Sequence, residues 1–141
     1  QGLYEVINKK KYAGNYHKVT FRSSWEFDVF ELMDKNDEVI KWNSEEIKIP
    51  YYDSTKRKKR TYFTDIYCEF INGQKYIFEI KPAQKLIKPN KKNKKAYIEH
   101  INIMEKAQAA KQYCRLLSYK GVNIKFAFLC LIKGKYKIID Y

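Results

Sequence analysis

The sequence predicts a single α/β domain in which a helix, a strand, a β-hairpin, a long helix and two further strands follow one another. Apolar residues recur at helical spacing after Ser23 and again between Ala96 and Tyr119. The pair Asn72-Gly73 separates two apolar segments, and a near-continuous apolar run extends from Ile124 to Leu131. The 141 residues suggest one domain, and a hydrophobic content of 45% supplies enough apolar material for a core.

The first helix is expected at about residues 24–34. Ser23 and Glu26 form the S-x-x-E pattern of a capping box, and the apolar residues that follow recur at helical spacing. Residues 1–20 carry the triplet Lys9-Lys10-Lys11 and little apolar periodicity, so we expect a basic N-terminal arm that crosses the surface. Residues 21–141 would then form the domain itself.

The strands of the first half follow this helix. Alternating apolar residues between Val39 and Tyr52 predict one strand, which Pro50 marks as an edge strand or as its end. The segments Tyr62 to Ile71 and Gln74 to Lys81 flank Asn72-Gly73 and predict a hairpin at the centre of the sheet.

The second half begins with a lysine-rich segment, residues 85–95, that predicts a basic loop. A helix from Ala96 to Tyr119 should end at Gly121. The apolar run after it predicts a buried strand, and Lys133-Gly134 turns the chain back into a last strand, residues 136–141.

Composition limits the function. A net charge of +13 favours a polyanionic partner, nucleic acid first, although a ribosomal-type basic protein has the same charge. Three separated cysteines and two distant histidines exclude a disulfide framework and a Cys/His zinc site. We also expect no membrane span and no secretion signal. Any catalysis must therefore use carboxylates and lysines.

Asp65, Glu79 and Lys81 are charged residues within apolar strands. Alternation along a strand places Glu79 and Lys81 on one face. A two-residue hairpin loop would place Ile66 opposite Glu79 and send Asp65 to the other face, whereas a three-residue loop ending at Gly73 would place Asp65 opposite Glu79. The sequence leaves both registers open.

Two carboxylates opposite each other repel, and a divalent cation between them would reverse that interaction. The three-residue loop therefore predicts a metal site at Asp65 and Glu79. The alternative is structural: a surface pair of Glu79 with Lys81, and Asp65 at a strand end.

These residues resemble a known motif. Asp65, followed by Glu79-Ile80-Lys81, resembles the PD-(D/E)XK nuclease motif, with Thr64 where the motif name has proline. Longer segments resemble the head-completion nucleases of T-even-like phages, and the same core is shared by TnsA-type transposon-end nucleases. The segments are Lys11-Tyr12-Ala13-Gly14, Phe21-Arg22-Ser23-Ser24-Trp25-Glu26, Trp42-Asn43-Ser44-Glu45, Ile49-Pro50-Tyr51, Arg60-Thr61-Tyr62-Phe63-Thr64-Asp65-Ile66 and Glu79-Ile80-Lys81-Pro82.

The resemblance implies a restriction-endonuclease-like fold, a mixed central sheet flanked by helices, and metal-dependent hydrolysis of DNA. It implies that Asp65, Glu79 and the backbone carbonyl of Ile80 hold Mg²⁺, with Mn²⁺ as a substitute, while Lys81 orients the attacking water or stabilises negative charge. Glu26 is a further candidate because a helix glutamate reaches the metal in many such nucleases, although it also fits the capping box. Glu45 matches a glutamate of the phage family.

The basic segments next to the motif are candidate DNA contacts. They comprise Lys56, Arg57, Lys58, Lys59 and Arg60, then Gln84, Lys85, Lys88, Lys91 and Lys92. The alternatives to this role are a solvated loop at residues 56–60, a linker with no role at residues 85–95, and an ordinary surface residue at Gln84. The expected partners are double-stranded or branched DNA and phage head or portal proteins, in the host cytoplasm or the virion, with no small-molecule cofactor. The alternatives are a TnsA-type transposon-end nuclease and a non-catalytic basic DNA-binding protein of the virion neck.

Overall fold

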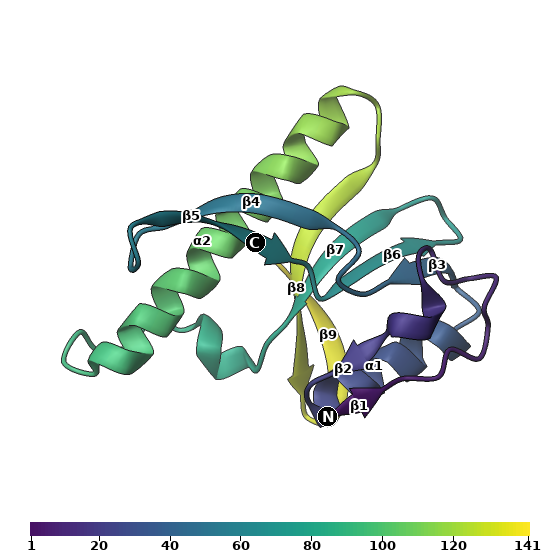
Figure 1. The fold of residues 1–141 in the computed structure, drawn as a ribbon, viewed down its shortest axis with the longest axis horizontal. Helices are drawn as coiled ribbons and strands as arrows, with labels where there is room; N and C mark the ends of the chain where they lie inside the picture. The colour runs from purple at the N-terminus through teal and green to yellow at the C-terminus, as the bar shows by residue number, and fades with distance from the viewer.

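The computed structural model describes residues 1–141 and is built on a mixed five-stranded sheet (Figure 1). The strands run in the order β3-β6-β7-β8-β9, and only the β7–β8 pair is parallel. Their bounds are Val39–Asn43 for β3, Ile66–Phe70 for β6, Lys75–Ile80 for β7, Ile124–Ile132 for β8 and Lys135–Asp140 for β9. This architecture confirms the expected α/β class with a mixed central sheet.

A helix covers each face of the sheet. Helix α1, Ser24–Lys35, packs on one face, and the longer α2, Lys94–Tyr119, packs on the other. Strand β8 serves both layers because its side chains alternate: Ala127 and Leu129 join the α1 core, whereas Phe128 and Cys130 join the α2 core. Strand β8 is buried on both faces of the sheet, which explains the near-continuous apolar run from Ile124 to Leu131, as expected.

The first 20 residues form more than a surface arm. Strands β1, Gly2–Leu3, and β2, Thr20–Phe21, pair with each other, and the 3₁₀ helix η1, Tyr16–Lys18, precedes β2. Four side chains of the segment are buried in the α1 core: Tyr4, Val6, Tyr12 and Val19. Lys9 and Lys10 are exposed, so the surface of the segment is basic while its other side completes the core.

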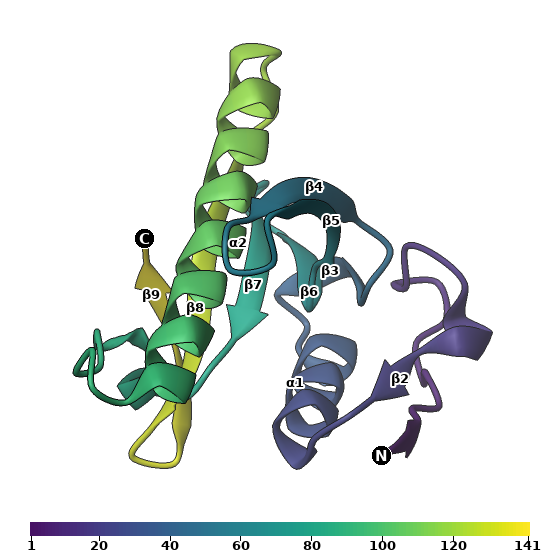
Figure 2. The same ribbon diagram turned by 60° about the vertical axis from the view of Figure 1, so that its left-hand side comes forward.

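The segment expected as one strand from Val39 to Tyr52 is two strands. Strand β3 ends at Asn43, and β4, Lys48–Asp53, pairs instead with β5, Lys58–Phe63, in a separate two-stranded ribbon. Pro50 lies inside β4 opposite Thr61, and it is tolerated because the ribbon leaves one edge of β4 unpaired. Figure 2 shows this curved ribbon beside α2.

The segment expected from Tyr62 to Ile71 also divides, because Thr64 and Asp65 interrupt it between β5 and β6. The hairpin that follows has the three-residue loop: Phe70 pairs with Gln74 through its backbone N–H, and Gly73 has a φ of +91°. With this register, Ile66 lies opposite Phe78 and Cys68 opposite Tyr76. Continuing it by one residue places Asp65 opposite Glu79.

The helices begin and end where the sequence indicates. Ser23 caps α1 by accepting a hydrogen bond from the backbone N–H of Glu26. Helix α2 begins two residues before the expected Ala96, capped by Asn93, and Gly121 follows its end with a φ of +90°. The basic loop before α2 is shorter than expected, because residues Ala83–Leu86 form a second 3₁₀ helix, η2.

Candidate active site

Two acidic residues meet where β6 begins and β7 ends. Glu79 is buried, with 5% of its surface exposed, and Asp65 directly precedes β6 on the same face. The Asp65 carboxylate accepts a 2.9 Å hydrogen bond from the backbone N–H of Ile80 through Oδ2. The side chain of Asp65 therefore bonds to the end of β7, and its carboxylate lies beside that of Glu79.

Glu79 is held by groups from two strands. The hydroxyl of Tyr62, on β5, donates a 2.8 Å hydrogen bond to Oε1, and Lys81 Nζ lies 3.8 Å from Oε2. Lys81 directly follows the last residue of β7, and its ammonium group lies on the same side as Glu79, as the alternation predicts. One oxygen of Glu79 is thus oriented by a phenol, and the other faces an ammonium group.

The two carboxylates affect each other electrostatically. Burial, followed by the negative charge of Glu79, raises the pKa of Asp65 well above its usual value. Burial, again followed by the charge of Glu79, raises the pKa of Tyr62 above its usual value, so this phenol remains a hydrogen-bond donor. The site places two carboxyl groups together in a desolvated position, where a bound cation would offset their mutual repulsion.

Thr64 stands where the motif name has proline, and it has a structural role there. Its side chain is fully buried, and its backbone N–H donates a 3.1 Å hydrogen bond to the carbonyl of Ile47. Its carbonyl accepts from the backbone N–H of Glu45. A proline could not make the first of these bonds because it has no N–H. The bonds of Thr64 thus attach the Asp65 turn to the segment between β3 and β4.

Glu26 occupies the first turn of α1 and completes a variant of the predicted capping box. Its Oε1 accepts a 2.9 Å hydrogen bond from the backbone N–H of Arg22, one residue before the N-cap. Its charge also contributes to the raised pKa of Asp65. The capping role is therefore observed, and Glu26 lies within electrostatic range of the carboxylate pair.

Glu45 lies in the connection between β3 and β4 with a φ of +59°. Its carboxylate forms an ion pair with Arg22, whose backbone N–H is held by Glu26. The structure thus links Glu45 to Glu26 through one arginine, while the backbone of Glu45 bonds to that of Thr64.

The predicted DNA contacts lie in two places. Lys56 to Arg60 form the turn and first residues of the β4–β5 ribbon, all five are exposed, and Arg60 pairs with Asp53 at 3.2 Å. Gln84 and Lys85 lie on η2, where Lys85 pairs with Glu99 at 3.1 Å. The remaining three, all exposed and between η2 and α2, are Lys88, Lys91 and Lys92.

Two neighbours of the site were missed by sequence reasoning, Tyr62 and Lys106. Lys106, on α2, places Nζ 5.6 Å from the ring centroid of Tyr62 and forms no ion pair. The chain contains many lysines and tyrosines, so nothing in the sequence distinguishes these two residues from the others. Only the packing of α2 against the ribbon distinguishes them.

The residues present fit a magnesium ion through two carboxylates. No three histidine, cysteine, aspartate or glutamate side chains converge as a metal cluster. Mg²⁺ is typically bound through one or two carboxylates, with waters and substrate phosphate oxygens as the remaining ligands. Asp65 and Glu79, desolvated and adjacent with one lysine beside them, provide that number.

Comparison with known proteins identifies the family of the chain. Residues 36–126 match the family described as "TnsA-like endonuclease N terminal". The match includes β3 through the first residues of β8, with Asp65, Glu79 and Lys81 inside it. The chain belongs to this endonuclease family.

A relative gives a more particular comparison. The "Head completion nuclease" of Enterobacteria phage T4 is 45% identical over 90 residues, which are 64% of this chain and 60% of the relative. The aligned part thus spans about three-fifths of that protein's length. No solved structure matches the chain. No helix is both long and apolar enough to cross a bilayer.

Proposed function

We propose that this protein is a Mg²⁺-dependent DNA endonuclease that acts in phage head completion. The observation that supports this most directly is the convergence of Asp65 and Glu79 beside Lys81, within a chain of the TnsA-like endonuclease family. The net charge of +13 suits a polyanionic substrate. The name of the phage relative supports the place of action.

In the proposed mechanism, Asp65, Glu79 and the carbonyl of Ile80 hold the metal. When bound, Mg²⁺ would activate a water and neutralise charge on the scissile phosphate. Tyr62 keeps Glu79 oriented through its 2.8 Å hydrogen bond. Lys81, 3.8 Å from Glu79, is placed to orient the attacking water or to stabilise the charge that develops on the phosphate.

Glu26 and Glu45 complete the proposed site from outside this group. Glu26 lies close enough to influence Asp65. Glu45 forms an ion pair with Arg22, whose backbone N–H bonds to Glu26. We propose that Glu26 would help to hold the metal and that Glu45 is a positioning residue.

The two basic segments are proposed to contact the DNA backbone. The exposed cations at the turn of the ribbon and those between η2 and α2 would neutralise phosphates without reading sequence. Double-stranded or branched DNA is the proposed substrate, and phage head or portal proteins are the proposed partners.

The test is nicking of supercoiled plasmid DNA with Mg²⁺ or Mn²⁺. We expect wild-type protein to nick and Asp65→Ala and Glu79→Ala to be inactive while still binding DNA. If wild-type protein and Asp65→Ala are equally inert with both metals and still bind DNA, the non-catalytic virion neck protein is the correct reading.

The second candidate is a transposon-end nuclease of the TnsA type, which the family match favours. The two are separated by substrate, because that candidate requires cleavage confined to specific ends. Cleavage of plasmid DNA that carries no transposon end would favour the phage function.

A further inference from the structure

The outer face of the β4–β5 ribbon exposes aromatic and basic side chains that the core does not use. Residues directly opposite in an antiparallel pair share a face. Phe63 lies opposite Lys48 and Tyr52 opposite Lys59, and all four are exposed. Phe63 is 49% exposed and Tyr52 54% exposed, whereas the inner face of the ribbon is buried against α2. Large aromatic side chains left in solvent on one ribbon face suggest a ligand with flat apolar surfaces.

The charge of this face is uniformly positive. Lys48 Nζ lies 5.7 Å from the ring centroid of Phe63, and the adjoining turn carries Lys56 and Arg57. The one carboxylate of the two strands, Asp53, is buried and accepts hydrogen bonds from Thr55, Lys56 and Arg60. No carboxylate of the two strands therefore offsets the lysines of the outer face, and an anionic ligand is favoured.

One end of this face is close to the candidate active site in the sequence. Phe63 is separated from Asp65 by Thr64 alone, and the preceding residue, Tyr62, bonds to Glu79 on the inner face. The cross-strand pairs Lys48–Phe63 and Tyr52–Lys59 are four residues apart along the ribbon, which is about 13 Å at the rise of a β-strand. The Phe63 end of this face is therefore the end nearer to Asp65 along the chain.

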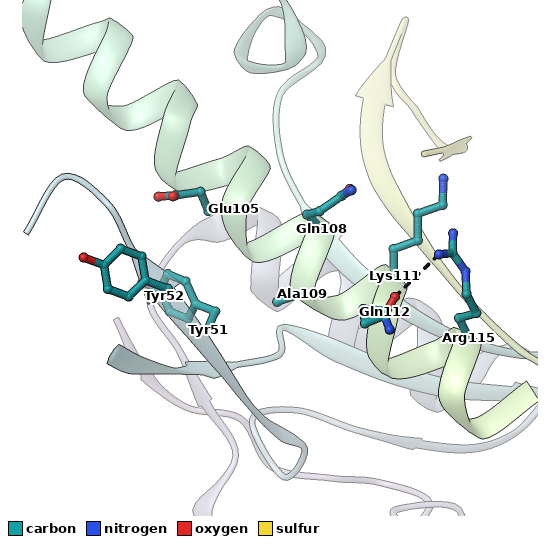
Figure 3. Close-up of a pocket in the computed structure, with 8 residues that line it drawn as sticks. All are labelled: Tyr51, Tyr52, Glu105, Gln108, Ala109, Lys111, Gln112 and Arg115. Carbon is teal, nitrogen blue, oxygen red and sulfur yellow. Dashed lines mark hydrogen bonds between the residues drawn. The ribbon is translucent and has the colours of Figure 1, made fainter. Parts of the chain in front are cut away.

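The positive surface continues beyond Tyr52. This residue lies at the rim of a groove of about 400 Å³ between β4 and α2, shown in Figure 3. Lys111 and Arg115 line the groove from α2. Its acidic residue, Glu105, accepts hydrogen bonds from the backbone N–H of Ser54 and so is already engaged.

We infer that the outer face of the β4–β5 ribbon binds an unpaired DNA strand, with bases stacked on Phe63 and Tyr52 and phosphates beside the lysines. Alternating aromatic and cationic groups are the recognition mode of single strands, because every base has a stacking face. In a duplex those faces are occupied by neighbouring base pairs. This inference rests on the proposed nuclease function and specifies its substrate as DNA that is unpaired next to the cleavage position.

The test is a binding measurement with cleavage removed. Fluorescence anisotropy would compare a labelled oligothymidylate of about 20 nucleotides, longer than the usual site of one stacking platform, with a duplex of equal length. All proteins would carry Asp65→Asn. We expect Phe63→Ala and Tyr52→Ala each to weaken binding of the oligonucleotide about tenfold and binding of the duplex less than about twofold. The matched control is Tyr119→Ala, at a tyrosine that is 79% exposed on α2, and it should change neither.

Two results overturn the inference. Unchanged oligonucleotide affinity in both ribbon variants would remove the stacking role. An equal loss for oligonucleotide and duplex would instead make the ribbon a duplex contact, since a two-stranded ribbon also fits the major groove. The proposed nuclease function is tested separately, by measuring plasmid nicking by protein that retains Asp65. If the protein does not nick DNA but shows the expected binding pattern, the nuclease proposal is wrong, and the single-strand binding role of the ribbon face still holds.

Discussion

The hydroxyl of Tyr62 donates a 2.8 Å hydrogen bond to Oε1 of Glu79, and this bond joins the β4–β5 ribbon to the central sheet at the candidate active site. Both residues are buried, so neither group is free to exchange this partner for water. The bond fixes the direction of one carboxylate oxygen.

Tyr62→Phe should therefore reduce cleavage without unfolding the protein. The change removes one hydroxyl and keeps the ring, and loss of such an outer contact typically costs about 10- to 100-fold in activity or metal affinity. The measurement is the rate of plasmid nicking at several Mg²⁺ concentrations. Tyr51→Phe is the matched control, because Tyr51 is also buried in the ribbon and its hydroxyl makes no hydrogen bond within the protein. Equal rates for both variants would show that the bond does not position Glu79.

Asp65→Asn should abolish cleavage and raise the thermal stability of the metal-free protein at neutral pH. The folded state raises the pKa of Asp65, so the folded protein holds this proton more tightly than the unfolded chain. Its contribution to stability is therefore favourable at low pH and is lost as the pH rises through the folded pKa. Calorimetry between pH 5 and 8 should show a smaller loss of stability in Asp65→Asn than in wild type. A variant less stable than wild type at pH 8 would contradict this.

Mg²⁺ should raise the melting temperature of wild-type protein. An ion that binds the folded state alone stabilises it by mass action, and here it would also neutralise the repulsion between Asp65 and Glu79. Thermal unfolding with increasing Mg²⁺ measures this. The increase should disappear in Glu79→Gln, and a similar increase in both proteins would place the ion elsewhere.

Ser23→Ala should destabilise the protein by about 1 kcal/mol, the usual cost of losing an N-cap side chain. Ser23 Oγ accepts from the backbone N–H of Glu26, and that N–H would lose its partner. Urea unfolding measures the change. Ser24→Ala is the control, because Ser24 is exposed and its hydroxyl makes no hydrogen bond within the protein.

Asp53→Asn should destabilise the turn of the ribbon in a pH-dependent way. The hydrogen bond from Thr55 is the largest cause that lowers the pKa of Asp53 to about 2, with Arg60 also contributing. Because the folded pKa is lowered, this stability is present above the unfolded value near 4 and is lost as the pH falls towards 2. The difference in unfolding free energy between wild type and Asp53→Asn should therefore shrink from pH 5 to pH 2.5. A difference that stays constant over this range would show that the charge of Asp53 contributes nothing.

The sequence by itself determined the class of fold, both helices, the last two strands and the positions of Asp65, Glu79 and Lys81 in the motif. These features depend on local signals: the Ser23 cap, the 3.6-residue period of α2, the turn residues and the alternation that places Glu79 and Lys81 on one face. Only the tertiary structure decided that Val39 to Tyr52 is two strands and that the first 20 residues complete a core. It also decided that Tyr62 bonds to Glu79 and that Lys106 lies over the ring of Tyr62. The sequence also left two hairpin registers open, and the three-residue loop ending at Gly73 places Asp65 opposite Glu79. The physical reason is range: periodicity and capping act within a few residues, whereas strand partners and the neighbours of a buried carboxylate are set by packing between distant segments.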